Sequence, residues 1–209
     1  VHAPFDLQVS LMDLPALFQS TLDNLPGRRP YIRAEPTRAK HWASRFAEPG
    51  FKVGLVWAGG AVGQQRVASL KLRACQLEHL EPLATIPNVE LFGLQKGPGA
   101  AQADALSPSF LIRNIGEEFT DFADTAGAIE NMDLIISVDT SVAHLAGAMG
   151  KPTWVLLKFD ADWRWLLERS DSPWYPSMRL FRQARNETWP TVIERITQAL
   201  REFLKEDRS

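Results

Sequence analysis

The stretch DLIISVDTSVAHLAGAMGKPTWVLL, residues 133–157, sets the expectation for the fold. It reads as an apolar, β-branched run, a polar turn, a helix rich in small residues and a second apolar run. Gly150 suits the left-handed position that follows a helix, and Pro152 prevents the helix from continuing. The pattern therefore predicts a strand, a helix and a parallel strand, at 133–138, 141–149 and 153–157.

The same alternation runs through the chain from residue 51 onward. Further strands are predicted at 51–58, 89–95, 109–115 and 178–183, and further helices at 75–87, 121–132 and 188–206. The last helix carries Ile193, Ile196, Leu200 and Leu204 along one face. Strands that are apolar on both faces and alternate with helices indicate a parallel sheet covered on both sides. Residues 51–209 are therefore predicted as an α/β, Rossmann-like, doubly wound domain with about six strands.

Residues 1–50 have a different pattern, with repeated proline and leucine and only short helical stretches. Proline interrupts any long element there. Helical spacing of Trp42 and Phe46 precedes the Pro49–Gly50 break. We interpret 1–50 as a helical or irregular connecting arm.

Composition excludes several classes of function. The formal net charge is −2, and the basic residues are scattered, which argues against a nucleic-acid partner. Cys75 is the only cysteine, so neither an intramolecular disulfide nor a thiolate metal cluster can form. No apolar run approaches the roughly 20 residues of a membrane span, and the first residues lack the plan of a signal peptide. We expect a cytoplasmic protein, and the initial valine is consistent with a piece of a longer chain.

The turn at Asp139, Thr140 and Ser141 has two interpretations. These residues can cap the free N–H groups at the start of the 141–149 helix. Alternatively, the turn lies at the carboxyl end of a strand, where helix N–H groups and hydroxyls bind phosphate. His144, one turn into the helix, either points toward the ligand or packs against the sheet.

A second candidate is Lys96, which ends the 89–95 strand and opens a Gly-Pro loop. A cation there can neutralise a diphosphate without a metal, although a solvated loop lysine is an equally good interpretation. The glycine-rich segment 57–63 does not have the G-x-G-x-x-G spacing of a dinucleotide site. Carboxylates at 160–168 fit no metal-ligand spacing. Trp163 either packs on the domain or forms a wall of a sugar or base pocket.

Four motifs occur along the chain in this order: FKVGLVWAG, LFGLQKG, DFADTAGAIENMDLIISVDTSVAHLAGAMGKPTWVLL and DWRWLLERSDSPWYPSMRLFRQ. Residues 133–157 resemble the signature of glycosyltransferase family nine, the ADP-heptose–lipopolysaccharide heptosyltransferases. The motifs together resemble more closely the glycosyltransferase-like C-terminal part of bacterial tetratricopeptide-repeat proteins, which are related to O-GlcNAc-transferase-like enzymes. It covers nearly the whole chain.

The resemblance implies the C-terminal half of a GT-B fold, which binds a nucleotide-sugar donor, and sugar transfer that is usually inverting and metal-independent. No cofactor is expected beyond the donor substrate. The implied diphosphate site comprises Lys96, Asp139, Thr140, Ser141 and His144. The implied nucleotide or sugar pocket comprises Gly59, Arg66, Asp121, Phe122, Thr125 and Trp163.

Two departures from the family pattern bear on activity. The segment after the first strand reads GAVGQQRVASLKL, with Gly60 where relatives usually have Asn. The family's catalytic base lies in an N-terminal domain that this chain largely lacks, so no catalytic base is assigned. The expected partner is an N-terminal glycosyltransferase domain or a tetratricopeptide-repeat region of a longer chain. The alternative is a non-catalytic nucleotide or sugar-phosphate binding module.

Overall fold

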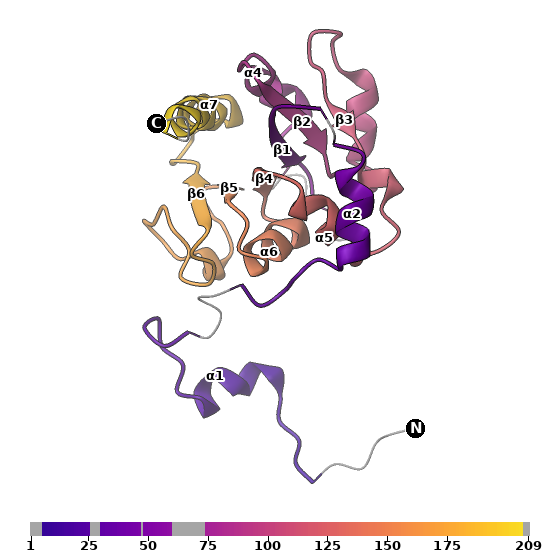
Figure 1. Cartoon of the computed structure of the whole chain (residues 1–209). Coiled ribbons are helices and arrows are strands. Elements are labelled where there is room, and N and C mark those ends of the chain that lie inside the picture. The colour runs from indigo at the N-terminus through magenta and orange to yellow at the C-terminus, as the bar shows by residue number, and fades with distance from the viewer. Residues whose placement is uncertain (1–5, 26–29, 47, 60–73, 207–209) are drawn as a thin grey trace.

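The computed structural model describes residues 6–25, 30–46, 48–59 and 74–206. Within these ranges, six parallel strands form one sheet in the order β3-β2-β1-β4-β5-β6 (Figure 1). The strands are β1 Phe51–Val56, β2 Val89–Gly93, β3 Arg113–Asn114, β4 Leu134–Val138, β5 Thr153–Leu157 and β6 Met178–Arg182. This is the Rossmann order, in which the chain reverses its direction of winding between β1 and β4. The predicted doubly wound sheet is therefore confirmed.

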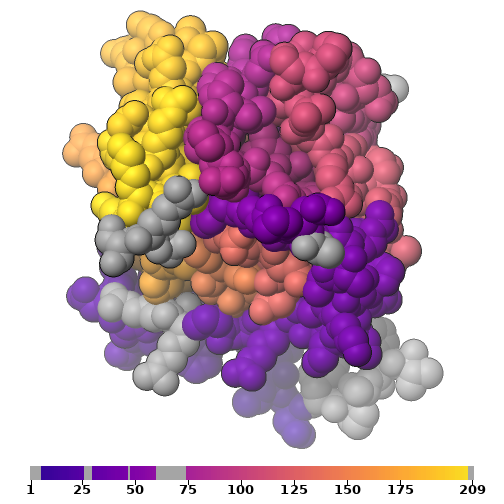
Figure 2. Space-filling model, turned by 45° about the horizontal axis from the view of Figure 1, so that its top comes forward, coloured from indigo at the N-terminus to yellow at the C-terminus, as the bar shows by residue number. Residues whose placement is uncertain are grey.

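Helices cover both faces of the sheet (Figure 1). On one face, α4 Glu81–Ala84 and α7 Trp189–Glu206 close a core that joins Val53 and Ile136 to Ile196 and Leu200. The yellow α7 lies against the magenta segment that contains α4 (Figure 2). On the other face lie α2 Pro36–Ala43, α5 Phe122–Glu130 and α6 Ser141–Ala148. Every residue of β4 and β5 is buried, and apart from Ser137 and Thr153 these residues are apolar, as expected of a sheet covered on both sides.

The central βαβ unit agrees closely with the bounds predicted from the sequence. Strand β4, helix α6 and strand β5 lie within one residue of their predicted bounds. Gly150, two residues beyond α6, has a φ of +74°, as the left-handed position requires. A Cβ at Gly150 would lie 2.4 Å from Pro30, so the chain before α2 packs closely on this turn. The backbone N–H groups of Tyr31 and Ile32 both donate to the carbonyl of Ala148, at 2.9 and 3.2 Å.

Two predicted elements differ from the structure. The helix predicted at 75–87 is a 3₁₀ turn, Leu77–Leu80, followed by the one-turn α4. Pro82 lies in the first turn of α4, where its missing N–H is tolerated, and it interrupts the longer helix. The strand predicted at 109–115 is reduced to the two residues of β3 at the edge of the sheet.

Residues 30–46 pack against the sheet domain, whereas 6–25 expose apolar side chains. Helix α2 lies on α5, and its Trp42 is 2% exposed, in the core that also contains Phe46. The earlier segment contains the one-turn α1, Leu14–Leu17. Its large apolar side chains that are at least half exposed are Leu7, Leu11, Met12, Leu17 and Phe18. Within the described ranges, none of the helices combines the length and apolar character needed to cross a membrane.

Candidate functional site

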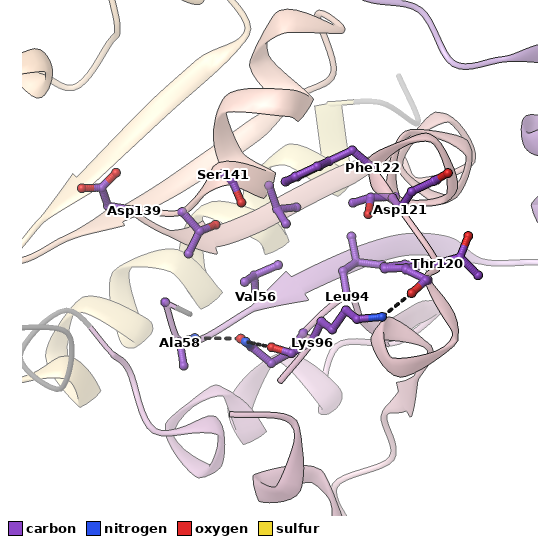
Figure 3. Close-up of a pocket in the computed structure, with 15 residues that line it drawn as sticks. Val56, Ala58, Leu94, Lys96, Thr120, Asp121, Phe122, Asp139 and Ser141 are labelled. Atoms are coloured by element: carbon purple, nitrogen blue, oxygen red, sulfur yellow. Dashed lines mark hydrogen bonds between the residues drawn. The ribbon is translucent and has the colours of Figure 1, made fainter. Parts of the chain in front are cut away.

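A cavity of about 510 Å³ opens at the carboxyl edge of the sheet (Figure 3). Its walls are the residues that follow β1, β2 and β4, together with the segment that leads into α5. This position is the crevice of the β1/β4 switch point, where open α/β sheets bind their ligands. Eight predicted site residues line it: Gly59, Lys96, Asp121, Phe122, Thr125, Asp139, Thr140 and Ser141.

The N-terminus of α6 faces this cavity. Thr140 is the N-cap residue, but its side chain makes no capping hydrogen bond. Its hydroxyl lies instead 3.0 Å from the hydroxyl of Ser137, on the buried side of the turn. The Thr140 hydroxyl therefore leaves the first N–H groups of the helix to other acceptors, where the helix dipole favours an anion.

Lys96 lies opposite this helix end, at the carboxyl end of β2 (Figure 3). Its Nζ donates to the backbone carbonyl of Phe119, and the side chain as a whole is exposed. Gly97 follows with a φ of +80°, and its N–H donates to Glu117 at 2.8 Å. The ammonium is thus held at the rim of the cavity by one carbonyl, with donor capacity left for a ligand.

Gln95, which the sequence analysis did not single out, fixes the floor of the cavity. Its side chain is 3% exposed and accepts hydrogen bonds from the N–H groups of Trp57 and Ala58, at 3.2 and 2.9 Å. Its amide nitrogen donates to the carbonyl of Lys96 at 3.1 Å. One buried amide therefore joins the ends of β1 and β2. A polar residue at the end of the apolar run 91–94 was the signal available in the sequence.

The opposite wall is the start of α5. Asp121 caps this helix by accepting from the N–H groups of Ala123 and Asp124, both at 2.9 Å. The Asp121 carboxylate is thus committed to the helix end. Phe122 is 59% exposed at the rim, and Thr125 is buried beneath it with its hydroxyl donating to the Asp121 carbonyl at 3.2 Å. An exposed aromatic ring beside an apolar wall suits a planar ligand.

Asp124 holds this wall in place from behind. Its carboxylate accepts from the Thr120 hydroxyl at 2.5 Å, from the Thr120 N–H at 2.9 Å and from Arg38 of α2. The hydrogen bond from the Thr120 hydroxyl, followed by those from the Thr120 N–H and Arg38, lowers the pKa of Asp124 to about 2. Arg38 also lies 3.8 Å from Asp121, so α2 supports the residue that caps α5.

His144 and Trp163 do not line this cavity. The His144 ring stacks on Trp165, with Nδ1 3.2 Å from the Tyr175 hydroxyl and Nε2 3.8 Å from Asp139. Trp163 is 68% exposed, on the loop after β5, with its edge against Trp174. Arg66, in the 60–73 segment, lies outside the described residues.

The cavity combines positive and apolar character. Its positive end is formed by Lys96 and the start of α6, and its apolar wall includes Val56, Leu94, Phe119, Phe122 and Val142. Such an arrangement can hold an anionic group at one end and a flat, weakly polar group at the other. Among the described residues, no group of three or more His, Cys, Asp or Glu side chains could hold a metal ion.

The fold is similar to that of two solved glycosyltransferase structures. The chain is similar to E. coli ADP-heptose LPS heptosyltransferase II, with a TM-score of 0.63 and 15% identity, over 90% of this chain and 57% of that one. It is also similar to the glycosyl transferase family 9 structure from Veillonella parvula DSM 2008. That comparison has a TM-score of 0.60 and 12% identity, over 88% of this chain and 56% of that one. At these identities the similarity establishes a shared α/β Rossmann-like fold.

Sequence comparison adds two partial matches. Residues 87–158 match the model of glycosyltransferase family 9 (heptosyltransferase), and this stretch contains Lys96, Asp121 and the 139–144 turn. Protein FlbA of Caulobacter vibrioides is 28% identical over 211 residues, which cover 95% of this chain and 33% of that protein. The chain thus spans about a third of the length of this curated relative.

Proposed function

We propose that the cavity binds the nucleoside diphosphate of a nucleotide-sugar donor, and that the chain is the donor-side domain of a glycosyltransferase. The observation that carries the proposal is the pairing of Lys96 with the N-terminus of α6 across one cavity at the β1/β4 switch point. The match of residues 87–158 to glycosyltransferase family 9 supports it.

The diphosphate would lie at the positive end of the cavity. Backbone N–H groups at the start of α6 and the Thr140 and Ser141 hydroxyls would donate to its oxygens, and Lys96 would neutralise part of its charge. These groups stabilise a leaving nucleoside diphosphate, whose negative charge grows as the bond to the sugar breaks. Because protein groups supply this positive charge, we expect binding without an added metal, and transfer with inversion at the sugar.

The base would lie against the apolar wall. Phe122 presents an exposed ring at the rim, and Leu94 and Phe119 form the surface below it. Stacking and apolar contact would orient the base. The hydrogen bonds of the buried Gln95 amide fix the backbone at the bottom of the cavity. Gly59, which also lines the cavity, gives the ligand close access to the backbone at the end of β1.

The acceptor and the catalytic base would come from elsewhere in a longer protein. The chain spans little more than half of the two solved glycosyltransferases, at 57% and 56% of their lengths. An N-terminal glycosyltransferase domain, or a tetratricopeptide-repeat region that presents the acceptor, is the partner we propose. The catalytic base is expected on that partner.

Calorimetric titration with UDP, ADP and GDP in metal-free buffer tests the donor site. The variant is Lys96→Ala combined with Ser141→Ala. The matched control combines Lys40→Ala in α2 with Ser44→Ala at its C-cap, both at exposed positions. We expect one nucleotide to bind, with a loss of about 1–3 kcal/mol in the first variant and none in the control. Equal binding by both variants, or no binding by the folded wild-type chain, would refute the proposed site.

A non-catalytic binding module is the second candidate. The departure from the family pattern in the sequence at 60–69 favours it, because these residues come directly after Gly59, which lines the cavity. An assay of the whole protein with the nucleotide sugar that binds distinguishes the two functions. Release of free nucleoside diphosphate identifies a transferase or hydrolase, and tight binding with no turnover identifies a binding module.

A further inference from the structure

The His144 ring is held in a cage of aromatic residues behind the cavity. Its plane lies within 16° of the plane of Trp165, at a centroid distance of 5.2 Å, and Trp165 is fully buried. The Tyr175 ring packs against a second side of the imidazole, at a centroid distance of 5.7 Å, and its hydroxyl lies 3.2 Å from Nδ1. The ring therefore has little freedom to turn, and its Nε2 faces Asp139 at 3.8 Å.

Tyr175 is itself fixed by the fold. A Cβ on Gly147 of α6 would lie 2.6 Å from its ring, so the ring packs directly on the helix backbone. Tyr31, whose backbone N–H donates to the Ala148 carbonyl at the end of α6, is a neighbour of Tyr175. Burial, and then the neighbouring Tyr31 side chain, raise the pKa of Tyr175 above its usual value. The hydroxyl therefore keeps its proton at neutral pH.

The contacts of His144 select one tautomer. Nε2 lies 3.8 Å from the Asp139 carboxylate oxygen, and a hydrogen on Nε2 directs a positive dipole at that oxygen, so this tautomer is the favourable one. Nδ1 then bears the lone pair, and the Tyr175 hydroxyl donates to it. The His144 ring thus lies between the Tyr175 hydroxyl, at hydrogen-bond distance, and Asp139, a residue that lines the cavity.

We infer that Tyr175 is a positioning residue of the donor site, which acts by holding His144 in the Nε2–H tautomer against Asp139. This inference rests on the proposed function of the cavity. The Asp139 side chain is 11% exposed, at the edge of the place where the diphosphate would bind. Its negative charge there opposes an anion, and an N–H dipole directed at the carboxylate offsets part of that charge. Loss of the Tyr175 hydroxyl removes one of the two contacts that favour this tautomer, so the Nδ1–H tautomer becomes populated and the compensation weakens.

Tyr175→Phe tests the inference because it keeps the packed ring and removes only the hydroxyl. Tyr31→Phe is the matched control, since it removes a neighbouring tyrosine hydroxyl and leaves the Tyr175 hydroxyl beside His144 in place. The first readout is the pair of ¹⁵N shifts of the His144 imidazole in the free protein, assigned with His144→Gln. The second readout is the calorimetric affinity for the nucleotide that the wild-type chain binds.

We expect the wild type and Tyr31→Phe to show the Nε2–H tautomer and Tyr175→Phe to show a mixture. The affinity of Tyr175→Phe should be about 3- to 10-fold weaker, the effect of one neutral hydrogen bond. An unchanged tautomer, or a changed tautomer with unchanged affinity, would overturn the positioning role while leaving the proposed function intact. A wild-type chain that binds none of the three nucleotides would overturn the proposed function and this inference with it, whatever the ¹⁵N shifts show.

Discussion

At the scale of single residues, the Asp124 carboxylate is the point where α2, α5 and the cavity wall meet. Its partners are the Thr120 hydroxyl and N–H and the Arg38 guanidinium, and its side chain is only 6% exposed. Because the folded state favours the ionised form, the pKa of Asp124 falls to about 2. A carboxyl with a lowered folded-state pKa stabilises the fold above its unfolded-state pKa, about 4, and loses this contribution as the pH falls through about 2.

Asp124→Asn should therefore lower the free energy of unfolding at pH 7 by about 1–3 kcal/mol, through weakened bonds to a charged group. The difference from the wild type should shrink as the pH falls from about 4 to about 2, because the wild-type carboxyl then takes up its proton. Urea unfolding across this pH range measures the difference. Asp104→Asn, at an exposed carboxylate, is the control and should change little. A difference that stayed constant with pH would assign the loss to packing and not to charge.

Among the helices and strands, the predictions from sequence were most accurate where interactions between residues close in sequence determine the structure. The β4–α6–β5 unit was found within one residue because apolar runs, a small-residue helix and Gly150–Pro152 punctuation each act over a few residues. The two-residue β3 shows the opposite case, since its length depends on the register with β2. The cage around His144 and the contact of Arg38 with Asp124 join segments far apart in sequence, and no periodicity encodes such a contact.

Gly127→Ala tests how closely α2 packs on α5. Alanine is the better helix former by about 1 kcal/mol, so an isolated α5 would become more stable. In the structure, however, the new Cβ would lie 2.9 Å from the backbone of Arg38 and 2.9 Å from the Trp42 ring. Overpacking of this kind costs about 1–3 kcal/mol, so we expect no gain and a net loss of up to about 2 kcal/mol. Chemical denaturation gives the sign of the change in the free energy of unfolding. An increase equal to the difference in helix propensity would show that α2 moves to accommodate the methyl group at no cost.

At the scale of the whole molecule, the chain before β1 divides into two parts with different energetics. Residues 6–25 leave Leu11, Leu17 and Phe18 largely in solvent, so they contribute little to the folded domain. Residues 30–46 place Trp42 and Phe46 in the core beside α5 and tie Arg38 to Asp124. The predicted arm, 1–50, thus combines a solvent-exposed segment and a helix that completes one face of the sheet.

Two truncations should separate these parts. A chain that begins at Pro30 should keep the free energy of unfolding within about 1 kcal/mol, because few buried contacts are removed. A chain that begins at Phe51 loses the burial of Trp42, and truncating one large core aromatic alone costs about 3–5 kcal/mol. Since domains of this size are stable by only about 5–15 kcal/mol, the second truncation should unfold or become molten. Urea unfolding and near-ultraviolet circular dichroism measure both. A stable, nucleotide-binding chain from residue 51 would instead make α2 dispensable and fix the domain boundary at residue 50.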